Sequence, residues 1–124
     1  MANKEYVQWS EVESFCDQVA RKYKDADITG VYGPARGGLI FAVILSHRMN
    51  VPLLAAPCSG CIIIDDICDS GETMLHYANN TSGHSKPDYT IATMYYKEGA
   101  LVKPDFYVSE KSDKWIVFPW ECKD

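Results

Sequence analysis

The sequence predicts an α/β fold in which a mostly parallel sheet is flanked by helices. Short β-prone runs alternate with helical patterns along the chain, and a glycine-rich turn follows the first run. The run at residues 61–64 is apolar throughout, as in parallel strands that are covered on both faces. Because the chain has 124 residues, we expect one domain over residues 1–124.

The first expected element is an amphipathic helix over residues 11–23. Ser10 and Glu13 form a capping-box pattern at its start, and apolar residues then recur at helical spacing. We expect this helix to have a structural role.

A first β-loop-α-β unit follows this helix. Residues 28–32 are β-prone and end abruptly at the glycine-rich turn of residues 33–38. Residues 39–49 are apolar helix formers, and residues 51–56 are expected to form a buried strand.

A second unit begins with a strand at residues 61–64. Asp65 and Asp66 follow directly, so we expect both carboxylates at the carboxyl end of that strand, where ligands of open α/β sheets bind. A loop over residues 67–71 then leads into a helix over residues 72–77.

The remaining elements are short. A polar stretch at residues 79–88 precedes an expected strand at residues 89–95. Residues 106–108 and 115–118 are expected to be short strands or extended segments near the carboxyl terminus.

Composition and charge restrict the classes of function. The net charge of -5 argues against a protein that binds the phosphate backbone of nucleic acids. The longest uncharged apolar stretch, residues 37–46, is too short to cross a bilayer, so no membrane association is expected. The polar start at residues 1–10 and the odd number of cysteines, five, favour a cytoplasmic protein with reduced thiols. The spacing of Cys58 and Cys61 does not complete a zinc site, and their role stays open.

The segment after the second strand carries the strongest chemical signal. The adjacent acids Asp65 and Asp66 suit ribose hydroxyls and a hydrated Mg²⁺ ion. Free amides and the Ser70 and Thr73 hydroxyls at the start of a helix suit a phosphate group. The acid pair alone is equally typical of a solvated loop end.

The whole run of residues 62–73 resembles the phosphoribosyl-pyrophosphate motif of type I phosphoribosyltransferases. Apolar residues, two aspartates, two uncharged residues, a third aspartate, a small hydroxyl residue, glycine, any residue and threonine follow in the family's order. The resemblance implies that Asp65 and Asp66 face the ribose and the metal, and that Asp69 acts as general base. It also implies that the 5-phosphate is held by Asp69, Ser70, Gly71, Glu72 and Thr73.

The glycine-rich turn carries a second signal. Its glycines let the backbone approach a ligand, and Arg36 is able to meet a pyrophosphate oxygen or to remain a solvated cation. An Arg-Gly-Gly turn at this point grips the leaving pyrophosphate in the family that the chain resembles. The resemblance therefore implies donor-binding roles for Arg36 and Gly37.

The carboxyl-terminal stretch resembles the purine-binding hood of the xanthine-guanine and hypoxanthine enzymes. The resemblance implies that Lys97 donates to the exocyclic oxygen of a 6-oxopurine and that Trp115 stacks on its ring. Trp120 and Glu121 match the family's Pro-Trp-acid ending, and they line the purine pocket or only close the core. A tryptophan here is also typical of a core, and a lone lysine is typical of a solvated surface.

These resemblances predict transfer of phosphoribose from phosphoribosyl pyrophosphate (PRPP) to guanine, xanthine or hypoxanthine, which yields a nucleoside monophosphate and pyrophosphate. A homodimer is expected from the family and from Phe41, Tyr95 and Tyr96, which need to be covered. One departure leaves an alternative open. The family's long flexible loop is reduced to residues 57–60, so a noncatalytic or weakly hydrolytic regulator that binds PRPP or a nucleotide is the second hypothesis.

Overall fold

The computed structural model describes residues 3–79 and 89–121. The predicted polar stretch at residues 79–88 lies almost entirely outside the described residues. In chain order, the elements are β1 (Lys4–Tyr6), α1 (Trp9–Lys22), β2 (Val31–Tyr32), α2 (Gly37–Met49), β3 (Ile62–Cys68), α3 (Glu72–Asn79), β4 (Thr90–Tyr96), β5 (Phe106–Glu110) and β6 (Trp115–Val117).

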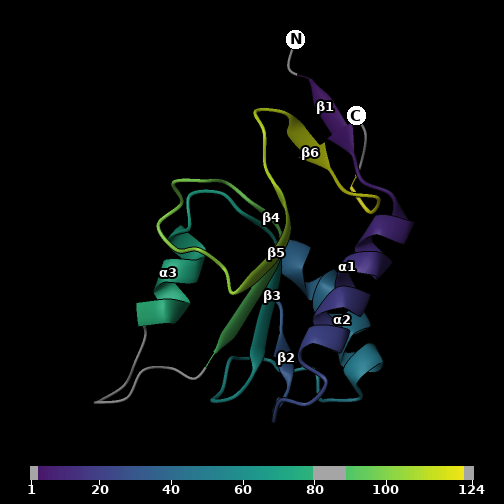
Figure 1. Cartoon of the computed structure of the whole chain (residues 1–124), viewed down its shortest axis with the longest axis vertical. Helices are drawn as coiled ribbons and strands as arrows, with labels where there is room; N and C mark the ends of the chain where they lie inside the picture. Colours follow the sequence, from purple (N-terminus) through teal and green to yellow (C-terminus); the bar gives the residue numbers. More distant parts are fainter. Residues whose placement is uncertain (1–2, 80–88, 122–124) are drawn as a thin grey trace.

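A parallel four-stranded sheet in the order β2-β3-β4-β5 forms the centre of the molecule. Helices α1 and α2 cover one face of this sheet, and α3 covers the other (Figure 1). The predicted α/β class is confirmed. Because all four strands run the same way, the segments that follow them meet at one edge of the sheet, which is the edge expected to bind ligands.

The small second sheet pairs the two ends of the chain. Strands β1 and β6 are parallel, with Lys4 opposite Trp115 and Tyr6 opposite Val117. Strand β1 was not predicted, because three mostly exposed residues show no readable alternation. This sheet lies beyond the carboxyl edge of the main sheet, near both termini (Figure 1).

The hydrophobic core lies in two parts, one on each face of the main sheet. On the α1 and α2 side, Phe15, Phe41 and Leu45 pack with Ile62 and Ile64. On the α3 side, the core comprises Cys61, Ile63, Cys68, Met74, Ile91 and Tyr96. The continuous apolar run at the start of β3 is therefore explained, because both of its faces are covered.

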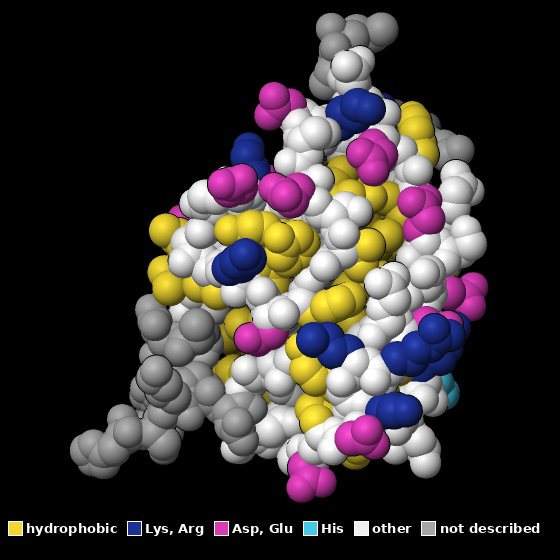
Figure 2. All heavy atoms as spheres, in the orientation of Figure 1, with side chains coloured by type: hydrophobic (Ala, Val, Ile, Leu, Met, Phe, Trp, Pro, Cys, Tyr) yellow, Lys and Arg dark blue, Asp and Glu magenta, His cyan; other side chains and the backbone are white. Residues whose placement is uncertain are grey.

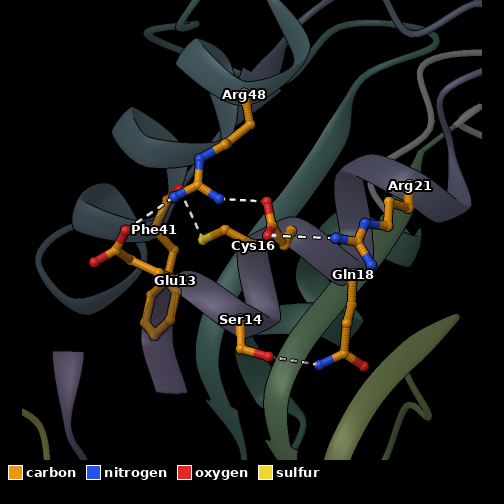
Figure 3. A network of polar contacts seen from close by, with 8 residues as sticks. Glu13, Ser14, Cys16, Gln18, Arg21, Phe41 and Arg48 are labelled. Atoms are coloured by element: carbon orange, nitrogen blue, oxygen red, sulfur yellow. Dashed lines mark hydrogen bonds and ion pairs between the residues drawn. The ribbon is translucent and has the colours of Figure 1, made fainter. Parts of the chain in front are cut away.

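Polar contacts also join α1 to α2 (Figure 3). The Arg48 guanidinium on α2 donates to Glu13 Oε1 at 3.0 Å and to Asp17, both on α1. Nearby, the buried Cys16 thiol lies 3.8 Å from the Phe41 carbonyl, and burial raises its pKa to about 12. These contacts hold α1 and α2 against each other, which is a structural role.

Some predicted boundaries are wrong. The capping box is formed by Gln8 and Glu11, and the backbone amide of Gln8 donates to Glu11 Oε2 at 2.8 Å. Helix α1 therefore begins earlier than the pattern of Ser10 and Glu13 predicted. The predicted strand at residues 51–56 is reduced to one bridge between Val31 and Leu53. Pro52 lacks the amide that a central strand needs.

The side chains offered as a reason for dimerisation are covered within the chain. Phe41 is fully buried, and Tyr95 and Tyr96 are buried as well. They therefore provide no apolar surface for a partner, and the homodimer stays a prediction that rests on the resemblance alone.

The surface carries both signs of charge. On the face shown in Figure 2, acidic and basic side chains are spread around apolar ones. Over the described ranges, 3–79 and 89–121, every helix lacks the length and hydropathy needed to cross a bilayer.

Candidate functional site

A cavity of about 540 Å³ opens at the carboxyl edge of the main sheet. Its lining comes from the turn after β2, from β3 and from the carboxyl-terminal segment, and comprises Arg36, Gly37, Ile40, Asp66, Trp120 and Glu121. All but Ile40 were singled out from the sequence. Ile40 could have been found by helical spacing, since it lies three residues after Gly37 on the first turn of α2.

The two glycines at the start of α2 allow that helix to pack directly on the acidic part of β3. A Cβ added to Gly37 would overlap Asp66 Oδ2. A Cβ on Gly38 would lie 2.6 Å from the Ile64 carbonyl oxygen and 3.0 Å from Asp65 Oδ1. Larger residues at these positions would separate the turn from the carboxylates.

Asp65 and Asp66 lie inside β3, which continues to Cys68, and not after its end as predicted. The Asp66 amide donates to Asp65 Oδ1 at 2.9 Å, and the Ile67 amide donates to Asp66 Oδ1 at 2.7 Å. Burial, and then the neighbouring Asp66 charge, raise the pKa of Asp65 to about 8. At neutral pH the pair therefore carries less than its full negative charge.

The phosphate-binding candidates form the connection between β3 and α3. Asp69, Ser70, Glu72 and Thr73 are exposed, whereas Gly71 is buried with a φ of +85°. This left-handed conformation favours glycine, and a Cβ there would lie 2.6 Å from the Leu101 amide nitrogen. The accessible side chains thus surround a turn whose shape depends on Gly71.

The segment after β4 fastens this connection in place. The Lys97 amide donates to the Cys68 carbonyl at 2.9 Å, and the Leu101 amide donates to the Ser70 carbonyl at 2.9 Å. The Cys68 thiol donates to the Val102 carbonyl at 3.2 Å. Burial raises the pKa of Cys68, which therefore stays a thiol.

Asp69 has a lysine beside each of its carboxylate oxygens. The Lys97 ammonium lies 4.0 Å from Oδ1, and the Lys111 ammonium lies 4.0 Å from Oδ2. The structure thus brings together Asp69, the candidate base, and Lys97, the candidate hydrogen-bond donor to the purine oxygen. Sequence reasoning missed Lys111, because its position depends on where β5 ends, and no local pattern marks that point.

The two carboxyl-terminal tryptophans differ in their surroundings. Trp120 stacks on Phe118 with a centroid distance of 5.2 Å, and Phe41 and Trp9 pack against it. Trp115 on β6 is 64% exposed and does not line the cavity. Trp120 is held in the core beside the cavity, whereas Trp115 presents an open ring.

Glu121 is fixed at the cavity by a local turn. Its Oε1 accepts a hydrogen bond from the Phe118 amide at 2.8 Å, and its own amide donates to the Phe118 carbonyl at 3.0 Å. One carboxylate oxygen therefore holds the turn.

The short segment at residues 57–60 lies away from the cavity. The Thr29 amide donates to the Gly60 carbonyl at 3.0 Å, and the Thr29 hydroxyl donates to the Ser59 carbonyl at 2.8 Å. Thr29 precedes β2 and Gly60 precedes β3, so this turn sits at the amino edge of the sheet. It cannot cover a cavity at the carboxyl edge.

Comparison with known proteins finds relatives and solved structures that are purine phosphoribosyltransferases. No protein-family model matches the chain. The xanthine-guanine phosphoribosyltransferase of Vibrio vulnificus is 27% identical to this chain, and the alignment covers 98% of this chain and 91% of that protein. The purine phosphoribosyltransferase of Pyrococcus horikoshii is 30% identical, with a TM-score of 0.83 over 98% of this chain and 97% of that one. The xanthine-guanine-hypoxanthine phosphoribosyltransferase of Helicobacter pylori shares the fold, with a TM-score of 0.69 at 16% identity.

Proposed function

Because this chain belongs to the purine phosphoribosyltransferase family, we propose that its cavity joins a 6-oxopurine to the phosphoribose of PRPP and releases pyrophosphate. The products are a nucleoside monophosphate and pyrophosphate. The observation that carries the proposal is the convergence of Arg36, Gly37 and Asp66 with Trp120 and Glu121 around one cavity. Donor candidates thereby share a space with the two carboxyl-terminal candidates Trp120 and Glu121, whereas Asp69, Lys97 and Trp115 do not line this cavity.

The donor is proposed to lie between the turn after β2 and the start of α3. Its 5-phosphate is proposed to bind the exposed residues of the connection at residues 69–73, which leads into the amino-terminal end of α3. Its ribose hydroxyls face Asp65 and Asp66. Arg36 then supplies a planar cation for the pyrophosphate. The tight contact between Gly37 and Asp66 supports this arrangement, because it keeps the turn close to the acids.

Magnesium fits this donor site as a proposed cofactor. Within the described residues, no group of three or more acidic, histidine or cysteine side chains is placed to hold a metal ion alone. Mg²⁺ commonly uses one or two carboxylates together with substrate oxygens and water. Asp65 and Asp66 would supply the carboxylates, and the raised pKa of Asp65 indicates that two adjacent acids lack a compensating charge. When bound, the ion would neutralise charge on the pyrophosphate.

The acceptor chemistry is proposed to centre on Asp69. A purine ring nitrogen forms a bond to C1′ as the bond from C1′ to the pyrophosphate oxygen breaks, and pyrophosphate leaves with that electron pair. The ring proton passes to Asp69. Lys97 donates to the 6-oxo group, and the 4.0 Å separation of Lys97 from Asp69 supports this division of roles. Trp115 is proposed to stack on the purine with its exposed ring.

Residues 57–60 do not cover the cavity, and this affects the expected catalysis. An oxocarbenium-like state that is open to solvent reacts with water as well as with a purine. We therefore expect measurable hydrolysis of PRPP beside the transfer reaction.

The homodimer also belongs to the proposal, and light scattering on the purified protein tests it.

The deciding experiment measures pyrophosphate release from PRPP and Mg²⁺ with guanine, xanthine, hypoxanthine, adenine or no base added. We expect release that depends on an oxopurine, together with formation of the matching nucleotide. Release without any base would show that hydrolysis is the main activity. Retained PRPP binding without release would indicate a noncatalytic binding protein.

Two variants provide the controls for this assay. The double variant Asp65→Asn with Asp66→Asn should lose Mg²⁺-dependent PRPP binding, since neither side chain can then supply a carboxylate to the ion. Asp25→Asn changes an exposed aspartate before β2 and should behave as the wild type. An equal loss in both proteins would point to a folding defect and not to a donor site.

A further inference from the structure

Three neighbouring strands of the main sheet each end beside one charged residue of the same cluster. Asp69 follows β3, Lys97 follows β4, and Lys111 follows β5, each as the first residue after its strand. The strands are adjacent and parallel, so their carboxyl ends lie at one edge. The backbone repeats this arrangement, because the Lys97 amide donates to the Cys68 carbonyl and the Lys111 amide donates to the Tyr96 carbonyl at 2.8 Å.

The two lysines of this cluster differ in exposure. The Lys97 side chain is 47% exposed, whereas that of Lys111 is only 12% exposed. The Lys111 ammonium also donates to the Ser112 carbonyl at 3.3 Å. A lysine that loses most of its hydration needs fixed partners, and among the described residues Asp69 is the only carboxylate that pairs with Lys111. Lys111 is therefore the more enclosed of the two lysines, while the more exposed Lys97 has more room to reorient.

We propose that Lys111 is a positioning residue that keeps the Asp69 carboxylate oriented while Lys97 turns from Asp69 to the purine oxygen. This inference rests on the proposed function, in which Asp69 takes the ring proton. A Lys97 ammonium that turns to the purine oxygen moves away from Asp69 Oδ1. The Lys111 ammonium beside Oδ2 then remains as a cation that orients the carboxylate.

The first test compares steady-state kinetics of the wild type with Lys111→Met, Lys111→Arg and the exposed control Lys24→Met. We expect Lys111→Met to lower kcat about fivefold, the size expected for a charge pair with one half-exposed partner, and to leave KM for PRPP unchanged. Lys111→Arg should restore most of kcat, since it returns a cation. Lys111→Gln gives the same comparison if the methionine variant does not fold.

The second test repeats Lys111→Met in an Asp69→Asn background. Because Lys111 acts through Asp69, no further loss of kcat is expected there. An equal loss in both backgrounds would overturn the inference, as would an unchanged kcat in the single variant. A raised KM for the purine would also overturn it, by making Lys111 a direct substrate contact. If the wild type itself shows no purine-dependent release of pyrophosphate, the proposed function fails instead.

Discussion

The two halves of the candidate site are built differently. The donor half comprises Arg36, Gly37 and residues 65–73, and close backbone contacts hold it on the main sheet. The acceptor half comprises Lys97, which follows β4 of the main sheet, and Trp115, Trp120 and Glu121, which depend on the small β1–β6 sheet and the carboxyl-terminal segment. We therefore expect substitutions in the donor half to change PRPP binding, turnover or the pH dependence of stability, and substitutions in the acceptor half to change purine affinity or the free energy of unfolding.

Asp69→Asn should have the largest effect, because it removes the proposed base from the point where the two halves meet. We expect kcat to fall about 1000-fold, equivalent to about 4 kcal/mol, within the range of general base catalysis. The Kd of PRPP, measured by calorimetry, should change by less than about threefold, since the loop amides remain. A parallel loss of PRPP affinity would instead assign Asp69 to phosphate binding.

The two tryptophans of the acceptor half should respond in opposite ways. Trp120→Ala removes a ring that packs on Phe118, Phe41 and Trp9, so the free energy of unfolding should fall by about 3 kcal/mol. Trp115→Ala should leave that free energy nearly unchanged, because its ring is exposed, but it should weaken purine binding by about 1–3 kcal/mol. Urea denaturation and purine titration measure the two quantities.

If Trp115→Ala binds the purine normally, Trp115 does not stack on the substrate. Trp120, which lines the cavity, would then replace it as the candidate platform. Either outcome sharpens the boundary between the core and the purine pocket.

The donor half could be predicted from the sequence because its signals are local. A strand, two acids and a helix start occur within residues 62–73, and parallel strands place such segments at one edge of the sheet. The continuous apolar run also gave the position of β3 correctly. The extent of that strand was not predictable, because Asp65 and Asp66 are unusual strand residues. Each carboxylate accepts a hydrogen bond from the backbone amide of the residue that follows it.

The acceptor half was harder to predict from the sequence, because its geometry comes from segments that are far apart in the chain. Strand β1 exists only through pairing with β6, more than 100 residues later in the chain. The proximity of Lys111 to Asp69 likewise depends on the end of β5. Only the resemblance connected Lys97 and Trp120 to a purine, and local patterning alone would have left them as a surface cation and a core aromatic residue.

Asp65 gives the donor half a pH-dependent stability. Its folded pKa, about 8, lies above the ordinary value of 3.8, so the protonated form favours the folded state. This contribution is complete below about pH 4 and is lost as the pH rises through 8. In metal-free buffer, Asp65→Asn should therefore be more stable than the wild type by about 2 kcal/mol at pH 8.5, and nearly equal to it at pH 4.

Chemical denaturation of both proteins at several pH values measures this difference. Asp113→Asn, which changes an exposed acid between β5 and β6, should follow the wild-type curve. A wild-type stability that is flat between pH 5 and 8.5 would show that Asp65 is already charged in the folded protein.

The smallest effect is expected where the two halves are joined. The Tyr95 hydroxyl on β4 donates to Glu5 Oε2 on β1 at 3.0 Å, which ties the small sheet to the main one. Tyr95→Phe should cost about 1 kcal/mol of stability, the usual value of one hydrogen bond. Because β1 pairs with the strand that carries Trp115, KM for the purine should rise two- to threefold, by about 0.5 kcal/mol, while KM for PRPP stays constant. Tyr107→Phe on β5 is the matched control. A loss of stability without any change in purine KM would mean that the acceptor half keeps its geometry independently of this link.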